Sequence, residues 1–425
     1  MAAPPRFTEI LLLQPLRFLA IFLTVTLIGA TALKAADKAA VERQFQTWLQ
    51  SDIWPKAKKA GVSKKTFSGA TKGLTLNWKL PDLRPPGSSA QAPKKQRQAE
   101  FRAPSAYFNE NNLGALVNRG RGKLATHKKT LAQIEKKYGV PGRIIVAIWG
   151  RESGYGAAKI PHDALPILAT QAFMGRRKTF FENEFLAALK ILQEGHISRN
   201  ALKSSWAGAL GQPQFLPSKF LAFAVDFDGD GRRDIWNSVP DTLASIANYL
   251  KQNGWRTGRD WGYEAKIPAT VSCTLEGPEL GRPIKAWIDL GATRISGRPF
   301  PKHEIAHPGF LMMPQGRYGP AFVATENFYV LKTYNESDLY ALFIGHLADR
   351  YGANKKFLGK WKNVKGINRR DVQNMQVKLE NQGHDVGGAD GLVGFKTRIA
   401  VGLWQLKNGD PPTCFPDAAL AKKVR

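Results

Sequence analysis

A glutamate at the end of an apolar run is the residue best suited to acid–base chemistry in this chain. Glu152 lies in the stretch Ile144 to Ser153, just ahead of Gly154 and Gly156. Pro141 favours the first turn of a helix and the glycines favour its end, so we expect Glu152 in the last turn. There the negative end of the helix dipole and the apolar neighbours disfavour the ionised carboxylate. A carboxyl group that stays protonated near neutral pH is what glycosidic bond cleavage requires.

A second informative segment spans residues 205–218, Ser-Trp-Ala-Gly-Ala-Leu-Gly-Gln-Pro-Gln-Phe-Leu-Pro-Ser. Small residues followed by Gly, Pro and amides predict a tight turn that another molecule approaches closely. Gln214 could hydrogen-bond a sugar or an acetamido group, and Trp206 or Phe215 could stack on a sugar face. The alternative for residues 205–218 is a packed helix–loop–helix corner. The alternative for Glu152 is an ordinary helix-end glutamate on a solvated face.

An acidic loop follows, with the spacing of a calcium-binding loop. Aspartates occupy positions one, three and five, and a glycine occupies position six. The twelfth position is Asn237 instead of a bidentate glutamate, which weakens the site or moves the last ligand onward. The predicted ligands of a structural Ca²⁺ are Asp226, Asp228, Asp230, the backbone carbonyl of Arg232, and Asp241. The alternative is a loop of Asx turns without metal, which three aspartates at this spacing in a basic chain disfavour.

His303-Glu304-Ile305-Ala306-His307 matches the H-E-x-x-H pattern of zinc proteases. That chemistry needs both histidines one turn apart on a stable helix, together with a third ligand. Pro301 and Pro308 bracket the motif, so a helix there could hardly exceed one turn. We therefore predict a polar loop. No phosphate-binding glycine loop or nucleophile motif is present either, so no organic cofactor is expected.

The charge of the chain indicates a polyanionic partner. Its 425 residues are enough for two or three domains, and 62 Lys+Arg against 34 Asp+Glu give a formal charge of +28. Nucleic acid is not the expected partner, because no zinc-finger, leucine-zipper or RNA-recognition signature accompanies the charge.

The N-terminus has the order of an export signal. Arg6 and Arg17 precede an apolar run from Phe18 to Leu33, with small residues after it. We expect cleavage between Ala32 and Ala36, which makes residues 1–36 the signal; an uncleaved membrane anchor is the alternative. Elsewhere, Cys273 and Cys414 could form a disulfide outside the cytoplasm or remain two buried thiols.

Hydrophobic periodicity predicts a mainly helical chain with one β-leaning part. An extended excursion is expected over residues 80–104, and a basic connector over residues 355–366. In the last sixty residues, apolar faces are expected from Val372, Met375 and Leu379 and from Ile399, Leu403 and Leu406. The expected helices are 41–54, 124–138, 143–153, 183–194, 242–253 and 338–350, and the β-rich insert covers about 264–322, with strands at 269–272 and 286–290.

The chain resembles the lytic murein transglycosylases of the B type from about Phe45 to Arg350. Its last unit is similar to the common peptidoglycan-binding domain, through Asp390-Gly391-Leu392-Val393-Gly394 and Thr397-Arg398. The main resemblance is carried by Trp54-Pro55, Gly61-Val62-Ser63, Thr66-Phe67, Ala99-Glu100-Phe101, Tyr138-Gly139-Val140-Pro141, residues 147–153 and 207–218, the acidic loop with Trp236, Ala247-Asn248-Tyr249-Leu250, Asn327-Phe328-Tyr329 and Tyr334-Asn335.

The resemblance implies a mainly α (α+β) fold, with a lysozyme-like helical core, a small β-rich subdomain, an EF-hand-like loop and a C-terminal three-helix module. The implied domains are a catalytic domain over 37–354, a linker over 355–366 and a peptidoglycan-binding domain over 367–425. The implied partner is the glycan strand of peptidoglycan, with other wall enzymes as further candidates, and the implied state is a monomer in the periplasm.

The implied reaction is cleavage between N-acetylmuramic acid and N-acetylglucosamine, with Glu152 as the single acid/base and 1,6-anhydromuramyl ends as product. The substrate-binding candidates are Ser205, Gln214, Tyr334, Asn335 and Tyr155. Where the family commonly has Tyr-Gly-Gln, this chain has Gln212-Pro213-Gln214, which leaves the role of Gln212 open. The competing readings are a hydrolytic muramidase with a second carboxylate, a non-catalytic wall-binding protein, and a DNA-binding protein, against which the export signal argues.

Overall fold

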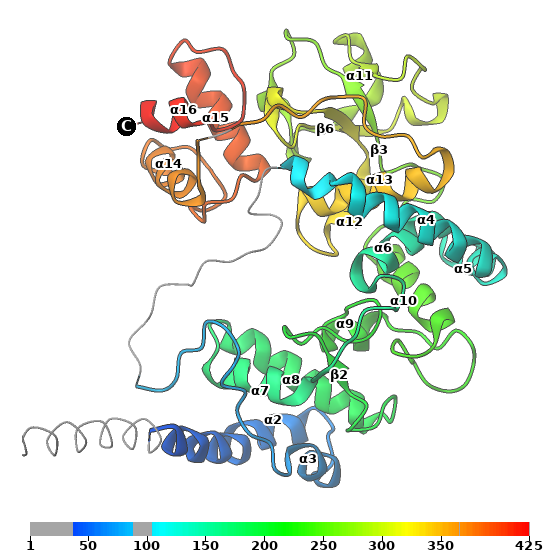
Figure 1. The fold of residues 1–425 in the computed structure, drawn as a ribbon, viewed down its shortest axis with the longest axis vertical. Helices are drawn as coiled ribbons and strands as arrows, with labels where there is room; N and C mark the ends of the chain where they lie inside the picture. The colour runs from blue at the N-terminus through cyan, green and yellow to red at the C-terminus, as the bar shows by residue number, and fades with distance from the viewer. Residues whose placement is uncertain (1–36, 88–103, 365, 425) are drawn as a thin grey trace, which may run out of the picture. The chain divides into compact units, whose positions relative to one another are not determined.

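The computed structural model describes residues 37–87, 104–364 and 366–424 (Figure 1). These residues form two compact units: one contains residues up to 87 together with Leu165–Gln193, and the other contains residues 104–164 and 194–424. The predicted export signal and most of the Pro-rich excursion lie outside the described residues. Within the described part, no helix combines the length and the apolar character needed to cross a bilayer.

The first unit is helical. Residues 37–48 form a helix that passes through a π-helical turn, Leu49–Ile53, into α2, Trp54–Lys59. The helix predicted over residues 41–54 is therefore present and extends further in both directions. The other helices of this unit are α3 (Lys64–Thr71), α7 (Ala164–Met174) and α8 (Lys178–Gln193). Its core includes Phe45, Phe67 and Phe185, which are all fully buried.

The second unit is organised around α6, Gly142–Ser153, which contacts four helices of the same unit. Nine of its twelve residues are buried, so α6 is a core helix and its apolar run needs no exposed face. The helices predicted at 143–153, 242–253 and 338–350 are confirmed within a few residues. The helices around α6 are α4 (Glu110–Thr126), α5 (Lys128–Tyr138), α10 (Val239–Gln252) and α13 (Asp338–Ala353), with α9 (Pro217–Phe223) and α12 (Glu326–Lys332) nearby in the same unit.

The β-rich part is an antiparallel sheet of five strands in the order β4-β6-β7-β3-β5, and a two-stranded ribbon pairs β1 with β2. The strands are β1 (His162–Asp163), β2 (Lys203–Ser204), β3 (Gly262–Lys266), β4 (Arg282–Pro283), β5 (Thr293–Arg294), β6 (Pro308–Met312) and β7 (Ala321–Ala324). The insert predicted at about 264–322 is thus present.

Two strand predictions inside this insert are wrong. Residues 269–272 form a turn, and residues 286–289 lie in the helix α11, Ile284–Asp289. The indole of Trp287 is fully buried and donates a hydrogen bond to the Gly309 carbonyl of β6 at 2.9 Å. Packing on the sheet therefore overrides the strand preference of this short apolar segment.

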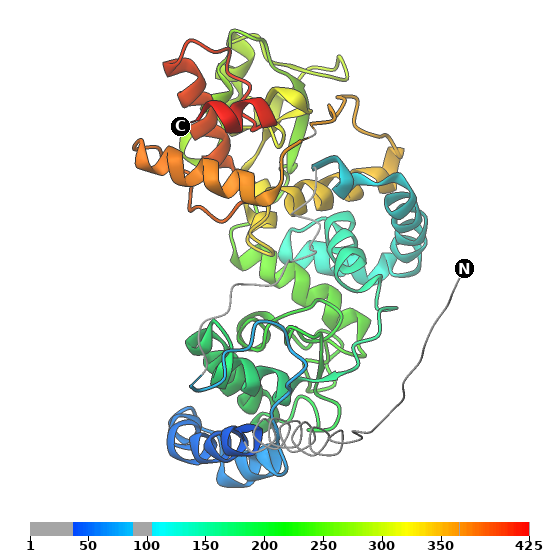
Figure 2. The ribbon, with the colours of Figure 1, turned by 60° about the vertical axis from the view of Figure 1, so that its left-hand side comes forward.

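The C-terminal segment contributes α14 (Arg369–Asn381), α15 (Phe395–Lys407) and α16 (Ala418–Lys423), which lie beside the sheet in the second unit (Figures 1 and 2). The face of α14 is as predicted, with Val372, Met375 and Leu379 buried. The face predicted for α15 is wrong, because Leu403 and Leu406 are 43% and 49% exposed. The helix instead buries the face that carries Ala400, Val401 and Trp404.

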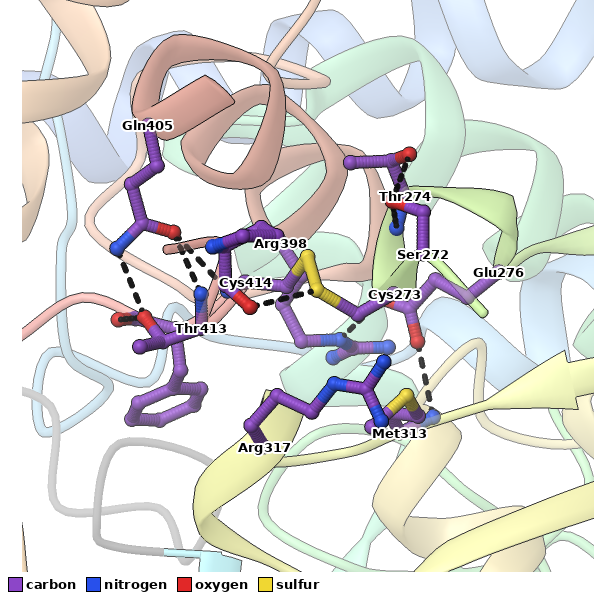
Figure 3. The surroundings of a disulfide bond; sticks show 12 residues. Ser272, Cys273, Thr274, Glu276, Met313, Arg317, Arg398, Gln405, Thr413 and Cys414 are labelled. Carbon is purple, nitrogen blue, oxygen red and sulfur yellow. Dashed lines mark hydrogen bonds and ion pairs between the residues drawn. A yellow bond between two sulfur atoms is a disulfide. The ribbon is translucent and has the colours of Figure 1, made fainter. Parts of the chain in front are cut away.

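Cys273 and Cys414 form a disulfide across a sequence separation of 141 residues. The bond joins the 3₁₀ turn Cys273–Leu275 to the loop after α15, and Figure 3 shows the side chains around it. The structure thus decides between the two states that the sequence left open.

We expect the Cys273→Ala/Cys414→Ala double variant to lose about 2–5 kcal/mol of unfolding free energy, because the cross-link restricts a long loop of the unfolded chain. Denaturant unfolding with and without reductant measures this loss. Reductant should lower the denaturant concentration at which half of the wild-type protein is unfolded, and it should leave that concentration unchanged in the double variant. Equal midpoints for the wild type with and without reductant would contradict the prediction.

Candidate active site

Helix α6 places Glu152 in its last turn, as predicted. Gly154 follows in the left-handed conformation with φ 58°, and its amide donates to the carbonyls of Gly150 and Trp149. This backbone conformation suits glycine and ends the helix next to Glu152. The buried body of α6 therefore fixes the position of the carboxyl group relative to the core of the second unit.

A tyrosine from α13 contacts the carboxyl group of Glu152. The Tyr340 hydroxyl donates a hydrogen bond to Glu152 Oε1 at 2.6 Å. Burial raises the pKa of Glu152 above its usual value, and this effect outweighs the opposing influence of the Tyr340 hydrogen bond, Arg151 and Lys219. The carboxyl group is therefore held toward its protonated form, which is the property inferred from its place in the sequence.

Tyr334 joins this carboxyl group to the glycine-rich corner. Its ring stacks on that of Tyr340, with centroids 6.1 Å apart and planes within 10°, and its hydroxyl donates to the Pro213 carbonyl at 2.8 Å. Burial raises the pKa of both tyrosines well above the usual value, so both hydroxyls stay protonated donors. The two rings therefore connect α13, the turn after α12 and the corner around Pro213.

The corner itself is a pair of tight turns. Ser205 Oγ accepts hydrogen bonds from the amides of Ala207 and Ala209, and Leu210 and Phe215 exchange two backbone hydrogen bonds. Gln214 has φ 54°, and its side-chain amide donates to the Gly211 carbonyl at 2.8 Å. The positive φ at Gln214 is strained for a residue with a Cβ, so its presence here is a candidate functional feature.

Gln212 has a structural role that the sequence left open. Its side-chain oxygen accepts from Trp149 Nε1 at 2.8 Å, and its amide donates to the Trp236 carbonyl at 2.9 Å. The side chain is buried and satisfied at both ends. Gln212 therefore ties the corner to α6, three residues before Glu152, and to the loop that precedes α10.

Of the two aromatic candidates for sugar stacking, only Trp206 is accessible. Its side chain is 52% exposed, whereas Phe215 is 1% exposed and packs against Tyr249 and Tyr334. The prediction of a stacking role for Phe215 is therefore wrong. Asn335 lies exposed in the turn between α12 and α13, next to Tyr334.

Tyr155 lies in the core. It is 4% exposed, its hydroxyl donates to the Leu116 carbonyl at 2.6 Å and shares a hydrogen bond with Tyr351, and its ring packs on Gly150 so closely that a Cβ there would collide with it. A buried, fully satisfied side chain is not available to a sugar. The structure therefore corrects this substrate-binding candidate to a packing residue that holds α6.

The acidic loop brings Asp226, Asp228 and Asp230 together, with one carboxylate oxygen of each within 4.8 Å of the others. Asp241 is not part of this group. It is buried at the start of α10 and accepts hydrogen bonds from the amides of residues 227, 228 and 234. Its carboxylate organises the loop backbone, so the ligand role predicted for Asp241 is corrected to a supporting one.

The H-E-x-x-H segment forms a single 3₁₀ turn, Lys302–Glu304. Glu304 is fully buried and pairs with Arg259 at 2.8 Å, while His303 and His307 are exposed. The glutamate is thus committed to a buried ion pair, and the two histidines do not share a helix face. The arrangement is that of a polar loop.

Two residues of the site carry no sequence signal. Tyr340 lies 188 residues from Glu152, inside an ordinary helical pattern. Lys219, from α9, has its ammonium group 3.1 Å from the Tyr249 hydroxyl and acts electrostatically on Glu152. Only the packing of α6, α9, α10 and α13 shows that these side chains surround the carboxyl group.

The sequence and the fold match known proteins. Residues 44–349 match the model of the transglycosylase SLT domain family. The chain belongs to the lytic murein transglycosylases. This family membership makes it an enzyme of the peptidoglycan lytic transglycosylase class. Among curated relatives, the membrane-bound lytic murein transglycosylase B of Escherichia coli K12 is 29% identical over 274 residues, which cover 63% of this chain and 72% of the relative.

Solved transglycosylase structures extend the match. SltB3 from Pseudomonas aeruginosa, in complex with NAG-anhNAM-pentapeptide, is 35% identical with a TM-score of 0.79, over 90% of this chain and 99% of that one. The Escherichia coli transglycosylase Slt35, in complex with calcium, is 27% identical with a TM-score of 0.50, over 60% of this chain and 79% of that one. The lysozyme-like transglycosylase fold is thereby confirmed.

Proposed function

We propose that Glu152 is the single acid/base of the transglycosylase reaction of this chain. The protonated carboxyl gives its proton to the oxygen that links N-acetylmuramic acid to N-acetylglucosamine, and the bond from C1 to that oxygen breaks. Glu152, now a carboxylate, accepts the proton of the C6 hydroxyl on the same muramic residue while that oxygen bonds to C1. The products are a 1,6-anhydromuramyl end and a free hydroxyl, and no water is consumed.

The observation that carries this proposal is the environment of Glu152. The pKa of its carboxyl is raised by burial, and the groups that act on it are a tyrosine, an arginine and a lysine. A two-carboxylate hydrolase instead places its second carboxylate about 5–9.5 Å from the acid. Among the described residues, the side chains with the largest influence on Glu152 include no carboxylate, which suits a reaction whose nucleophile is a hydroxyl of the substrate itself.

We further infer that the corner and the turn after α12 bind the glycan. Ser205, Gln214, Tyr334 and Asn335 are the candidates, and the exposed indole of Trp206 supplies an aromatic face. The hydrogen bond from Tyr334 to Pro213 and its stacking on Tyr340 support this assignment, since they join the corner to the catalytic carboxyl. The complexes of SltB3 with NAG-anhNAM-pentapeptide and NAG-NAM-pentapeptide favour a glycan strand with its stem peptide as the ligand.

Mass spectrometry of the sugars released from purified peptidoglycan tests the proposed reaction. Muropeptides one water lighter than hydrolysis products would support it. Fully hydrated reducing ends would establish a muramidase and require a second carboxylate. No release would mean a wall-binding protein or an enzyme that requires a partner.

We propose that the acidic loop binds a structural Ca²⁺. Three carboxylates that converge within 4.8 Å offer the hard oxygen ligands that this cation prefers. Asp226, Asp228 and Asp230 would hold it together with the Arg232 carbonyl, and the calcium complex of Slt35 supports the choice of ion. Its contribution is to fix the loop that leads into α10, and it takes no part in the chemistry.

Calcium at about a hundredfold excess over its dissociation constant should raise the unfolding free energy by about 2.7 kcal/mol. Thermal unfolding in chelator, in Ca²⁺ and in Mg²⁺ measures this gain. Asp228→Asn/Asp230→Asn should abolish it, whereas Asp289→Asn, an exposed aspartate on α11, should keep it. A Ca²⁺-independent melting temperature in the wild type would exclude the site.

We also propose that residues 367–425 bind peptidoglycan. The catalytic domain would cover residues 37–354, and residues 355–366 would connect the two. We propose further that the chain acts in the periplasm as a monomer. The exposed side chains of Val377, Leu403 and Leu406 and the charge of +28 support contact with an anionic wall polymer. Co-sedimentation of an inactive full-length variant with isolated peptidoglycan, at low and high salt, tests the binding.

A further inference from the structure

The C-terminal helices are held against the rest of the second unit by close contacts at glycines as well as by the disulfide. A Cβ at Gly316 would collide with the carbonyl of Thr413, and a Cβ at Gly277 would collide with the ring of Phe395. Both glycines also have positive φ. Glycine is therefore required at two points where the segments meet, which indicates a fixed interface instead of a flexible attachment.

A buried ion-pair network lies at the centre of this interface. Arg398 of α15 binds Glu276 at 2.6 Å and Asp338 at 3.0 Å, with the Arg398 and Glu276 side chains only 2% and 1% exposed. Figure 3 shows Arg398 and Glu276 beside the disulfide. Lys332 also pairs with Asp338, at 2.8 Å. Burial alone would raise the pKa of Asp338, but the two cations outweigh it and keep that pKa below its usual value.

Asp338 is the first residue of α13, the helix that carries Tyr340. The preceding residue, Ser337, caps the helix and accepts from the Tyr340 amide at 3.3 Å. A continuous path of contacts thus runs from Arg398 through the first turn of α13 to the Tyr340 hydroxyl on Glu152. Without Arg398, the only ion pair that Asp338 would keep among the described residues is that with Lys332. We expect the first turn of α13 to be held less firmly then, and the 2.6 Å hydrogen bond from Tyr340 to Glu152 to lengthen.

We propose that Arg398 is a positioning residue for catalysis: through Asp338, the C-terminal helices hold Tyr340 against Glu152. The C-terminal segment then serves the reaction itself, in addition to any wall binding. This inference rests on the proposed role of Glu152.

The test compares the double variant Glu276→Gln/Arg398→Met with wild type on soluble glycan strands. Removing both buried charges together avoids leaving one of them unpaired. We expect kcat to fall by about tenfold with KM within about twofold, because a lost positioning contact misplaces a catalytic group without weakening uniform binding. Combined with Tyr340→Phe, the double variant should cause no further fall, since both changes break the same contact.

Tyr318→Phe is the matched control. It removes the hydrogen bond from the Tyr318 hydroxyl to Asp417 at 3.1 Å, which crosses the same interface without reaching α13. Its kcat should match the wild type. Asp338→Asn, which keeps the Arg398–Glu276 pair, is the second variant if the first fails to fold, and it should lower kcat in the same direction.

Hydrogen exchange of the amides in the first turn of α13 gives a readout that does not depend on activity. Exchange there should be faster in the double variant than in Tyr318→Phe. Unchanged exchange, a change confined to KM, or losses that add to those of Tyr340→Phe would overturn the inference. A different result would show that the proposed role of Glu152 is wrong: the Glu152→Gln variant would be as active as the wild type.

Discussion

Glu152→Gln should lower the release of anhydromuramyl ends by about 10³-fold, because the amide can neither give nor take the proton that the reaction moves. Mass spectrometry of products from purified peptidoglycan measures the loss. Glu380→Gln, the same substitution at an exposed position on α14, should leave release unchanged.

The Glu152→Gln variant should also fold normally and melt no lower than wild type near neutral pH. The pKa of Glu152 is raised in the folded state, so ionisation above the unfolded pKa opposes folding progressively until the folded pKa is passed. A neutral amide removes that penalty. Full release of anhydro ends by a folded Glu152→Gln protein would show that another group is the acid.

Tyr340→Phe should reduce kcat/KM by about 10- to 100-fold. The tyrosine hydroxyl hydrogen-bonds the carboxylate that forms as Glu152 gives up its proton, and a hydrogen bond to a charged group contributes about 1.5–3 kcal/mol. The Tyr340 hydroxyl lowers the pKa of Glu152, so its loss should let burial raise that pKa further. The step that needs the protonated acid slows as pH rises through this pKa, and the high-pH limb of the rate profile should therefore move to higher pH.

Tyr351→Phe is the control for this shift, because Tyr351 lies on the same helix and hydrogen-bonds Tyr155 instead of Glu152. Its pH profile should follow the wild type. An unshifted high-pH limb in Tyr340→Phe would mean that the hydroxyl does not act on the acid in the working enzyme.

Local sequence rules located the main element of the site correctly. The apolar run of α6, its proline start and its glycine end act within a few residues, so they place Glu152 in the last turn without reference to the rest of the chain. The same holds for the acidic loop, whose aspartates accept hydrogen bonds from amides two to five residues away. The family resemblance added the reaction, which the residue pattern alone left open.

Local rules failed where packing chose between similar local options. The segment around Trp287 reads as a strand by its residue types, but it is a helix whose indole binds β6. On α15, Leu403 and Leu406 have core spacing, yet the helix buries the face that carries Ala400, Val401 and Trp404. Tyr155 follows Glu152 closely in sequence, and packing still puts it in the core.

The sequence by itself determined that the chain carries one acid at a helix end, an acidic loop and a glycine-rich corner, because each depends on neighbours along the chain. Only the tertiary structure decided what acts on that acid. The hydrogen bond from Tyr340 to Glu152 joins residues 188 positions apart, and the Cys273–Cys414 disulfide joins residues 141 positions apart. Contacts at such separations leave no periodicity or spacing in the sequence, because the packing of whole elements brings the partners together.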